Sequence, residues 1–221
     1  MKVLVIDIGG SNAKLRATGQ TARTKLPTGP ACTPDHLLAD LAAATAGWDY
    51  DAVTIGFPAP VVDGRLPFEP TNLGPGWVDF RFDLALGKPV KLLNDAAMQA
   101  VGCYQSGRLL FLSLGTGLGS ALIADHHVIP LELCELRWTR RSTIEDQLGK
   151  ASLRRLGRPR WEQLVHTTVA MLRRAFLPDA VVIGGGGSKH LKHLPPDTIR
   201  GDNTHALDGG ELVWTDSRFR V

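Results

Sequence analysis

Two stretches of this chain share one order of parts, in which an apolar strand, a glycine-rich turn and a second strand follow one another. The first stretch covers residues 2–18 around Gly9-Gly10, and the second covers 108–124 around Gly115-Thr116-Gly117-Leu118-Gly119. Glycine allows backbone N–H groups to approach a phosphate closely, because it has no Cβ. We therefore expect two similar halves, each presenting a hairpin to a phosphoryl donor between them. A simple structural hairpin is the alternative for each turn.

A third glycine-rich turn, at 184–188, follows an apolar run and precedes a short predicted helix. A nucleotide or phosphate packs well at such a strand-to-helix junction. The chain has no Gly-x-x-x-x-Gly-Lys-Ser/Thr sequence of a P-loop. It also has no Gly-x-Gly-x-x-Gly after the first strand, so a Rossmann domain is disfavoured.

The spacing of apolar residues predicts the remaining elements. We expect strands at 2–8, 13–18, 21–26, 52–57, 90–93, 108–113, 120–124 and 180–183, and helices at 34–46, 95–104, 142–156 and 160–176. Residues 58–87 form a long irregular excursion rich in Pro and Gly, and loops of that length are usually functional. The mixture predicts an α/β fold whose halves meet near residues 105–110.

The composition is that of a soluble globular protein, with 43% hydrophobic and 21% charged residues, and it excludes a disordered chain. A net charge of +3 is too small to predict nucleic-acid binding. Cys32, Cys103 and Cys134 lie far apart and form no Cys-x-x-Cys pair, so we expect no zinc site. We find no signal peptide and no apolar run of membrane-spanning length, and therefore expect a cytoplasmic protein without membrane contacts.

Basic residues are concentrated between Arg137 and Arg160. This segment contains Arg137, Arg140, Arg141, Lys150, Arg154, Arg155, Arg158 and Arg160, and its only acids after Arg137 are Glu145 and Asp146. One interpretation is a solvated helical face. The other is a surface that receives a polyanion.

Polar residues at the first turn provide candidate ligands for phosphate and metal. Asp7 ends the first strand and can hold Mg2+ directly or through water. Ser11, Asn12 and Lys14 can donate hydrogen bonds to phosphate oxygens. The alternative is a glycine hairpin with a capping aspartate.

Asn94 and Asp95 stand where a predicted strand ends and a helix begins. Phosphoryl transfer to a sugar hydroxyl needs a carboxylate that accepts the hydroxyl proton, beside a fixed hydrogen-bonding group. Asp95 fits the base and Asn94 the positioning group. The alternative is that Asp95 only caps the helix.

Further side chains suited to a sugar lie on either side of this pair. The excursion contains Asn72 and Trp77, an amide and an aromatic ring, although Trp77 is equally consistent with core packing. Glu132, Glu135 and Glu145 form an acidic group after the second glycine turn, and carboxylates accept sugar hydroxyl protons strongly. Plain surface charge is the alternative for these glutamates.

Taken together, these residues resemble a ROK-family sugar kinase of the actin-like ATPase superfamily, and within it the polyphosphate glucokinase branch. The matching stretches, which occur in family order over about residues 2–194, are Asp7 to Lys14, Phe57-Pro58-Ala59, Asn72 with Trp77, Asn94-Asp95-Ala96, Leu114 to Ser120, the surroundings of Glu132, Pro178-Asp179 and Ile183 to Lys189.

The resemblance implies an α/β fold of two actin-like (ribonuclease H-like) domains around a central cleft, over residues 1–107 and 108–221. It implies Asp95 as the catalytic base. The implied sugar-binding residues are Asn72, Asn94, Glu132 and Glu145, with Glu135 at the position of a family histidine. The implied donor-binding residues are Asp7, Gly9, Gly10, Ser11, Asn12, Lys14, Gly115, Thr116, Gly117, Gly119, Gly184, Gly185, Gly186 and Gly187.

The implied activity is phosphoryl transfer from polyphosphate, ATP or both to a hexose hydroxyl, with Mg2+ and a homodimer expected and no nucleic acid. The chain departs from the family's Glu-x-Gly-His element, since it reads Glu132-Leu133-Cys134-Glu135. The family's cysteine-rich zinc element is also missing, as in the polyphosphate branch. A catalytically silent sugar- or nucleotide-binding protein is therefore the alternative function.

Overall fold

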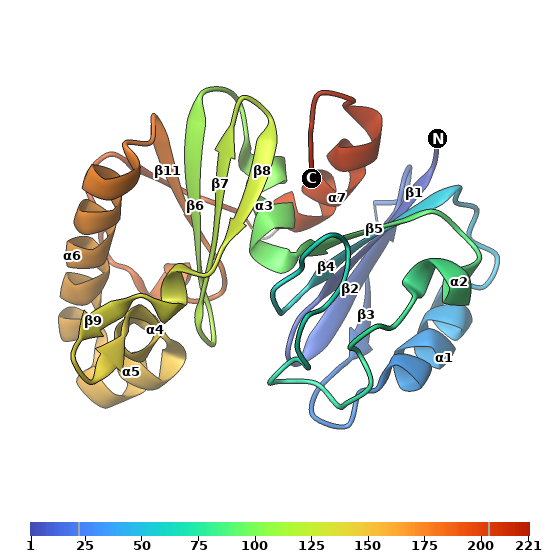
Figure 1. The fold of residues 1–221 in the computed structure, drawn as a ribbon, viewed down its shortest axis with the longest axis horizontal. Helices are drawn as coiled ribbons and strands as arrows, with labels where there is room; N and C mark the ends of the chain where they lie inside the picture. The colour runs from blue at the N-terminus through green and yellow to red at the C-terminus, as the bar shows by residue number, and fades with distance from the viewer. Residues whose placement is uncertain (22, 203) are drawn as a thin grey trace.

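Two five-stranded sheets stand side by side in the computed structural model, which describes residues 1–21, 23–202 and 204–221 (Figure 1). The first sheet, in the order β3-β2-β1-β4-β5, contains β1 (Val3–Ile8), β2 (Asn12–Ala17), β3 (Thr24–Pro27), β4 (Ala52–Phe57) and β5 (Val90–Asn94). The second, in the order β12-β11-β6-β7-β8, contains β6 (Arg108–Leu114), β7 (Leu118–Ala124), β8 (His127–Leu131), β11 (Ala180–Gly184) and β12 (Thr198–Arg200).

The two sheets have the same topology. In each sheet, three consecutive strands form an antiparallel meander. A fourth strand pairs in parallel with the first strand of that meander, and a fifth strand pairs in parallel with the fourth. The glycine-rich turns join β1 to β2 and β6 to β7, which are equivalent positions in the two sheets. The prediction of two similar halves, each with a glycine hairpin, is confirmed.

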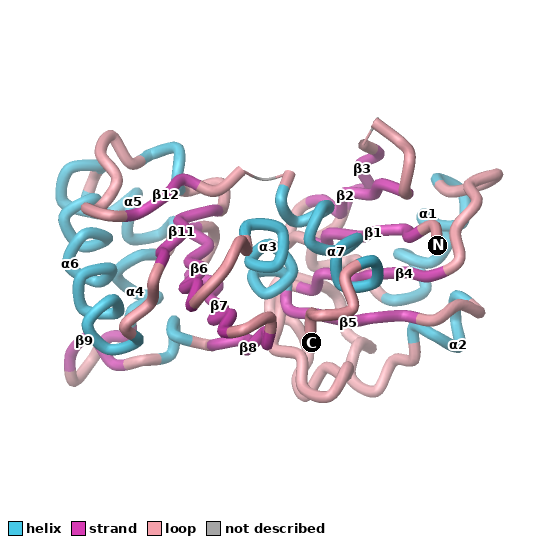
Figure 2. The backbone as a smooth tube through the Cα atoms, turned by 90° about the horizontal axis from the view of Figure 1, so that it is seen from above, coloured by secondary structure: helices cyan, strands magenta, loops and turns pink. Residues whose placement is uncertain are grey.

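The helices are divided between the outer faces of the sheets and the space between them (Figures 1 and 2). They are α1 (Pro34–Ala44), α2 (Phe82–Leu86), α3 (Asp95–Cys103), α4 (Ile144–Leu148), α5 (Lys150–Leu156), α6 (Arg158–Phe176), α7 (His205–Thr215) and the 3-10 turns η1 (Leu133–Glu135) and η2 (Ser188–His190). A small hairpin of β9 (Arg137–Thr139) and β10 (Ser142–Thr143) precedes α4.

Three apolar clusters hold these layers together. One joins α3 and α7 to the facing sides of both sheets, through residues such as Val5, Met98 and Phe111. A second lies between the first sheet and α1, and the third lies between the second sheet and α4 to α6. The central cluster fixes α3, and therefore its first residue Asp95, between the two halves.

Local sequence signals explain where several elements begin and end. The Thr33 side chain accepts a hydrogen bond from the His36 N–H and caps α1, with Pro34 in the first turn. Every residue of β1 and β4 is buried, which explains their continuous apolar runs. α6 ends at Phe176, and its C-cap Leu177 has a left-handed conformation directly before Pro178.

The single helix predicted at 142–156 is wrong. Ser142 and Thr143 pair with β9, and α4 and α5 are separate helices interrupted at Gly149, whose ψ of 163° is extended. A Cβ on Gly149 would lie 2.8 Å from the Thr116 carbonyl oxygen, so this break brings the α5 N-terminus against the second glycine turn. The apolar spacing continues through both helices, which is why the pattern concealed the break.

Other differences concern short or late elements. The third strand begins at Thr24 rather than Thr21, and Ala22 within the predicted range lies outside the described residues. Sequence reasoning also omitted α2, β8, β9, β12 and α7. The division into domains at 107 and 108 stays a prediction: β6 begins at Arg108, whereas α7 packs against α3 and β1 of the first half.

Candidate functional site

The first glycine turn is held in place by the segment that follows β3. Thr28 donates its hydroxyl to the Gly9 carbonyl at 2.6 Å, and its N–H bonds to the Ser11 carbonyl at 3.1 Å. The Gly9 N–H is already paired with the Asn12 carbonyl at 3.0 Å. Gly10, Ser11 and Asn12 are exposed at the tip of the turn, where a ligand can reach them.

Asp7 and Lys14 face each other across the β1–β2 pair. The Lys14 ammonium lies 2.9 Å from Oδ2 of Asp7, and Asp7 is only 6% exposed. The ion pair places one anion and one cation at the base of the first turn. Asn72 comes from the excursion to the same turn, since a Cβ on Gly10 would lie 3.2 Å from the Asn72 Cβ.

Asp95 is the first residue of α3, and Asn94 caps that helix. The Asn94 side-chain oxygen accepts the N–H groups of Ala96 and Ala97, and its amide donates to the Ala59 carbonyl at 3.3 Å. The alternative in which Asp95 is merely the cap is therefore wrong, because Asn94 performs that role. The carboxylate of Asp95 is therefore not used to cap the helix.

The pKa of the Asp95 carboxyl is raised to about 7, and burial is the largest cause. The nearby carboxylates of Asp7 and Glu132 contribute to this rise in pKa, and the Ala96 N–H and the Lys14 ammonium oppose it. A carboxyl group with a pKa near neutrality accepts and releases a proton readily, and such groups concentrate at catalytic sites.

The second glycine turn approaches Asp95 from the other half of the molecule. A Cβ on Gly119 would lie 3.9 Å from Oδ1 of Asp95 and 3.0 Å from the Ala96 Cβ. Glycine therefore favours the close approach of β7 to the start of α3. Asp95 therefore lies within reach of both predicted phosphate hairpins.

Glu145 lies directly against the second turn. A Cβ on Gly117 would lie 2.5 Å from Oε2 of Glu145. Glu145 also lies near enough to Glu132 to raise the pKa of that side chain. Glu145 thus lies between the second turn and Glu132, with which the sequence grouped it.

A cavity of about 430 Å³ joins the second and third glycine turns. Its lining includes Gly115 and Thr116 from one turn and Gly186 and Gly187 from the other. The basic residues Lys150, Arg154 and Lys189 complete it, two of them from the basic segment. Four of the predicted donor residues of the second half thus line one positively charged cavity, whereas Gly117, Gly119, Gly184 and Gly185 do not line it.

The third turn is built against the second. The Gly187 N–H donates to the Leu114 carbonyl at 2.7 Å, and a Cβ on Gly185, whose φ is +77°, would collide with the same carbonyl. Gly184 is buried against Phe111. Gly186 is exposed with open space around it, and therefore faces a ligand most freely.

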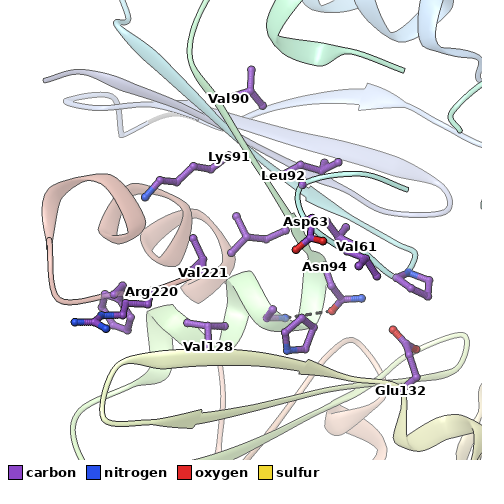
Figure 3. Close-up of a pocket in the computed structure, with 17 residues that line it drawn as sticks. Val61, Asp63, Val90, Lys91, Leu92, Asn94, Val128, Glu132, Arg220 and Val221 are labelled. Carbon is purple, nitrogen blue, oxygen red and sulfur yellow. Dashed lines mark hydrogen bonds between the residues drawn. The ribbon is translucent and has the colours of Figure 1, made fainter. Parts of the chain in front are cut away.

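A larger cleft, of about 740 Å³, lies between β5 and β8 (Figure 3). Asn94 and Glu132 lie at one end of it, and Lys91 and Arg220 lie toward the other. Burial raises the pKa of Glu132, and the carboxylates of Glu135 and Glu145 act in the same direction. The buried Cys134 thiol points at Glu132 with Sγ 3.5 Å from Oε2, and both Glu132 and Glu135 are exposed.

Comparison with known proteins gives a consistent result. No protein-family profile matches the chain. Polyphosphate glucokinase of Mycobacterium tuberculosis (strain CDC 1551 / Oshkosh) is 26% identical over 86% of this chain and 80% of the relative. That of Mycobacterium leprae (strain TN) is 29% identical over 86% of this chain and 65% of the relative.

Solved structures align over nearly the whole chain. Inorganic polyphosphate/ATP-glucomannokinase from Arthrobacter sp. strain KM superposes with a TM-score of 0.81 at 23% identity, over 97% of this chain and 99% of that one. A ROK family glucokinase from Streptomyces griseus, in complex with glucose and AMPPNP, gives 0.73 at 18% identity, over 96% and 99%. This chain has the fold of the ROK sugar kinases. The resemblance and the fold class predicted from the sequence are confirmed.

Within this ROK fold, Trp77 has a structural role. It is fully buried and packs on Phe57, Phe80 and Phe82, so its interpretation as a sugar platform is wrong. Its indole N–H has no hydrogen-bond partner among the described residues. The aromatic cluster anchors the excursion that carries Asn72.

Sequence reasoning missed Glu69, which closes that excursion. Its carboxylate accepts the N–H groups of Gly76, Trp77 and Val78, and the bond from Trp77 leads in lowering the pKa of Glu69. It also missed Lys189 at the donor cavity and the thiol of Cys134 beside Glu132. A lone acid or cysteine in a loop gives no periodic signal, so only the three-dimensional contacts show these roles.

Among residues 1–21, 23–202 and 204–221 no group of three or more His, Cys, Asp or Glu side chains could hold a metal ion. A magnesium ion in phosphoryl transfer needs only one or two carboxylates together with the donor phosphates, and Asp7 beside the first turn fits that requirement. No helix in the described part of the chain is long and apolar enough to span a membrane.

Proposed function

We propose that this chain is a sugar kinase that transfers a phosphoryl group from polyphosphate or ATP to a hexose hydroxyl. One observation carries the proposal: Asp95, whose pKa is about 7, lies between the two glycine hairpins at the junction of the two halves. The similarity to polyphosphate glucokinases supports the same activity.

Asp95 acts as the general base in this proposal. With its hydroxyl at the Asp95 carboxylate, the sugar loses a proton to that carboxylate as the hydroxyl oxygen attacks the donor phosphorus. Lys14 and the exposed tip of the first turn at Gly10 face the phosphates, and the Lys14 ammonium balances the developing negative charge. Mg2+ held by Asp7 and the donor would neutralise further phosphate charge.

The donor occupies the positively charged cavity between the second and third turns. Lys150, Arg154 and Lys189 offer cations to phosphate oxygens there. Trp161 in its lining is buried and donates its indole N–H to the Leu148 carbonyl, so among the aromatic lining residues only the half-buried His190 has a ring within reach of a nucleobase. With three cations and one histidine in the lining, phosphate contacts outnumber base contacts, which favours polyphosphate as donor.

The acceptor lies at the Asn94 and Glu132 end of the larger cleft. Glu132 accepts hydrogen bonds from sugar hydroxyls, and Asn72 of the excursion lies beside the first turn. Asn94 contributes mainly by holding the start of α3, because its amide already bonds to protein groups on both sides. Glu135 and Glu145 add negative charge around Glu132, which favours hydroxyl donors over anionic acceptors.

A coupled assay tests the proposal. Purified protein with Mg2+ should form sugar phosphate from at least one of glucose, mannose, N-acetylmannosamine or fructose, with polyphosphate or ATP as donor. Sugar binding without turnover for every pair would instead favour the catalytically silent alternative. If the protein shows neither sugar binding nor turnover, both the kinase proposal and the catalytically silent alternative are excluded.

A further inference from the structure

Glu132, which the proposed function assigns to the sugar, lies where its strand has just ended. β8 stops at Leu131, and η1 begins at Leu133. The Glu132 side chain is exposed and points from the end of β8 into the larger cleft (Figure 3). A side chain on one residue between two elements keeps a single direction only if the backbone on both sides of it is fixed.

The hydroxyl group of Ser120 fixes that backbone on both sides. Ser120 lies on β7 opposite Leu131, in the pair at the end of the β7–β8 ladder. Its Oγ donates to the Leu131 carbonyl at 2.7 Å and accepts the Leu133 N–H at 3.2 Å. One hydroxyl group therefore holds the residue before Glu132 and the residue after it.

The Ser120 hydroxyl lies where water does not easily replace it. Ser120 is 1% exposed and Leu133 is buried. Without the hydroxyl, the Leu131 carbonyl and the Leu133 N–H each lose a hydrogen-bond partner, and a buried polar group without a partner is costly. The backbone then shifts to regain partners, and Glu132 shifts with it.

The other contact to Glu132 acts only on its side chain. The Cys134 Sγ lies 3.5 Å from Oε2 of Glu132, and a thiol is a weak donor. Ser120 instead acts on the backbone, and it follows Gly119, where β7 passes the start of α3 beside Asp95. The same strand therefore sets the position of Glu132 relative to Asp95.

We propose that Ser120 is a positioning residue of the sugar site, whose hydroxyl holds the Glu132 carboxylate in the direction in which it meets the sugar. This inference rests on the proposed function for the role of Glu132. Ser120 is itself buried, so it acts on the sugar through Glu132.

Three variants test the role of the hydroxyl group. Ser120→Ala removes it, Ser120→Thr keeps it, and Ser152→Ala makes the same change at a buried serine whose hydroxyl has no hydrogen-bond partner among the described residues. Ser120→Ala should raise KM for the sugar by about five-fold or more, with kcat and KM for the donor changed less than about two-fold. Ser120→Thr and Ser152→Ala should stay within about two-fold of the wild type. A general loosening of the second hairpin would instead raise both KM values.

Glu132→Ala provides the comparison that separates positioning from a merely structural role. In the Glu132→Ala background, Ser120→Ala should change sugar affinity by less than about 1.5-fold, because the residue through which it acts is gone. Calorimetric sugar binding to the wild type, the two single variants and the double variant measures this coupling without turnover. Thermal unfolding identifies a misfolded Ser120→Ala. Ser120→Cys, which keeps only a weak donor, then replaces it, with a smaller rise in sugar KM expected.

The outcomes distinguish this inference from the kinase proposal. Wild-type sugar affinity in Ser120→Ala or in Glu132→Ala, or an equal effect of Ser120→Ala with and without Glu132, would overturn the positioning role and leave the kinase proposal intact. Coupled effects on sugar binding without any turnover would overturn only the kinase proposal. A wild type that binds no sugar would overturn both.

Discussion

The carboxyl group of Asp95 changes its protonation near neutral pH because three features of its surroundings disfavour the charged form. It is the first residue of a helix fixed between two sheets, and burial is the largest cause of its raised pKa. Asp7 and Glu132 add negative charge, only partly offset by Lys14. A base that titrates near the working pH combines a large reactive fraction with adequate proton affinity.

The pH dependence of the rate follows from that pKa. Asp95 must be deprotonated to accept the hydroxyl proton, so kcat/KM should rise with pH and level off above about 7. Initial rates between pH 5 and pH 9, at fixed donor and metal concentrations, check this. A profile that is flat or falls across the same range contradicts the assignment.

The same shift has a consequence for stability, and its sign is opposite to that of an ordinary salt-bridged aspartate. The folded-state pKa is raised from 3.8 to about 7, so the folded state binds more protons between these values. Stability from this group is therefore fully present below pH 3.8 and is lost as pH rises through about 7. Asp95→Asn lacks the ionisation, so its Tm should exceed the wild-type Tm by more at pH 8 than at pH 5. A Tm difference between the two proteins that is the same at pH 5 and pH 8 would contradict the raised pKa of the buried carboxylate.

Single-residue roles were only partly predictable from the sequence. The strand-to-helix junction indicated the importance of Asn94 and Asp95, but not which of them caps the helix. That distinction depends on the Asn94 hydrogen bonds to Ala96 and Ala97. Trp77 was ambiguous because its burial is decided by three phenylalanines at other positions of the chain.

At the scale of elements, the two glycine hairpins bring distant segments together. The second hairpin contacts the start of α3 through Gly119, the α5 N-terminus through the bond from the Lys150 N–H to the Thr116 carbonyl, and the third turn through Leu114. Lys150 and Arg154 thereby reach the donor cavity from α5. The sequence showed a basic segment, and the break at Gly149 directs Lys150 and Arg154 of that segment toward the donor cavity.

Gly186 gives a direct test of the donor cavity. A Cβ there meets no atom within 4 Å, and its φ lies outside the left-handed region, so a side chain costs the fold little. Gly186→Val should raise KM for the donor at least ten-fold with KM for the sugar changed less than two-fold. Gly187→Val is the contrasting variant, since its Cβ would lie 2.9 Å from the Leu114 carbonyl and should lower Tm. Equal effects of Gly186→Val on both KM values would point away from a donor cavity.

Neighbouring arginines of α5 test how a polyanionic donor is held. Arg154 lines the cavity and Arg155 does not, although both are exposed. Arg154→Ser should reduce kcat/KM for polyphosphate several-fold, and the loss should shrink at high salt because exposed charges are screened beyond about 10 Å at 0.1 M. Arg155→Ser should change it little. The same loss in both variants would indicate a diffuse field rather than a defined site.

Element prediction succeeded where burial makes a continuous pattern and failed where contacts outside the segment decide. The all-buried β1 and β4 were found with nearly their observed bounds. β8 was missed because its exposed residues and Pro130 weaken the pattern, while β7 supplies the hydrogen-bonded partner. The separation of α4 from α5 depends on the approach of Gly149 to Thr116, which no local sequence reports.

For the whole molecule, the repeated topology explains why the site lies where it does. Two equivalent sheets place their hairpins toward one another, and α3 and α7 between them connect both halves through a shared apolar cluster. The repeated strand–glycine–strand unit predicted this arrangement. The cleft between β5 and β8 was not predictable, because it arises from how two sheet edges, the excursion and the C-terminal segment meet.

The measurement that tests the account most directly is formation of sugar phosphate, followed by phosphorus NMR, with the wild type and with Asp95→Asn. The wild type should convert polyphosphate and hexose to a sugar phosphate. Asp95→Asn, which keeps the shape but cannot accept the proton, should be slower by roughly 10²–10⁴-fold. Calorimetry should show that it still binds the sugar with nearly wild-type affinity. More than a tenth of the wild-type rate in Asp95→Asn, or no sugar phosphate from the wild type with any donor, would contradict the account.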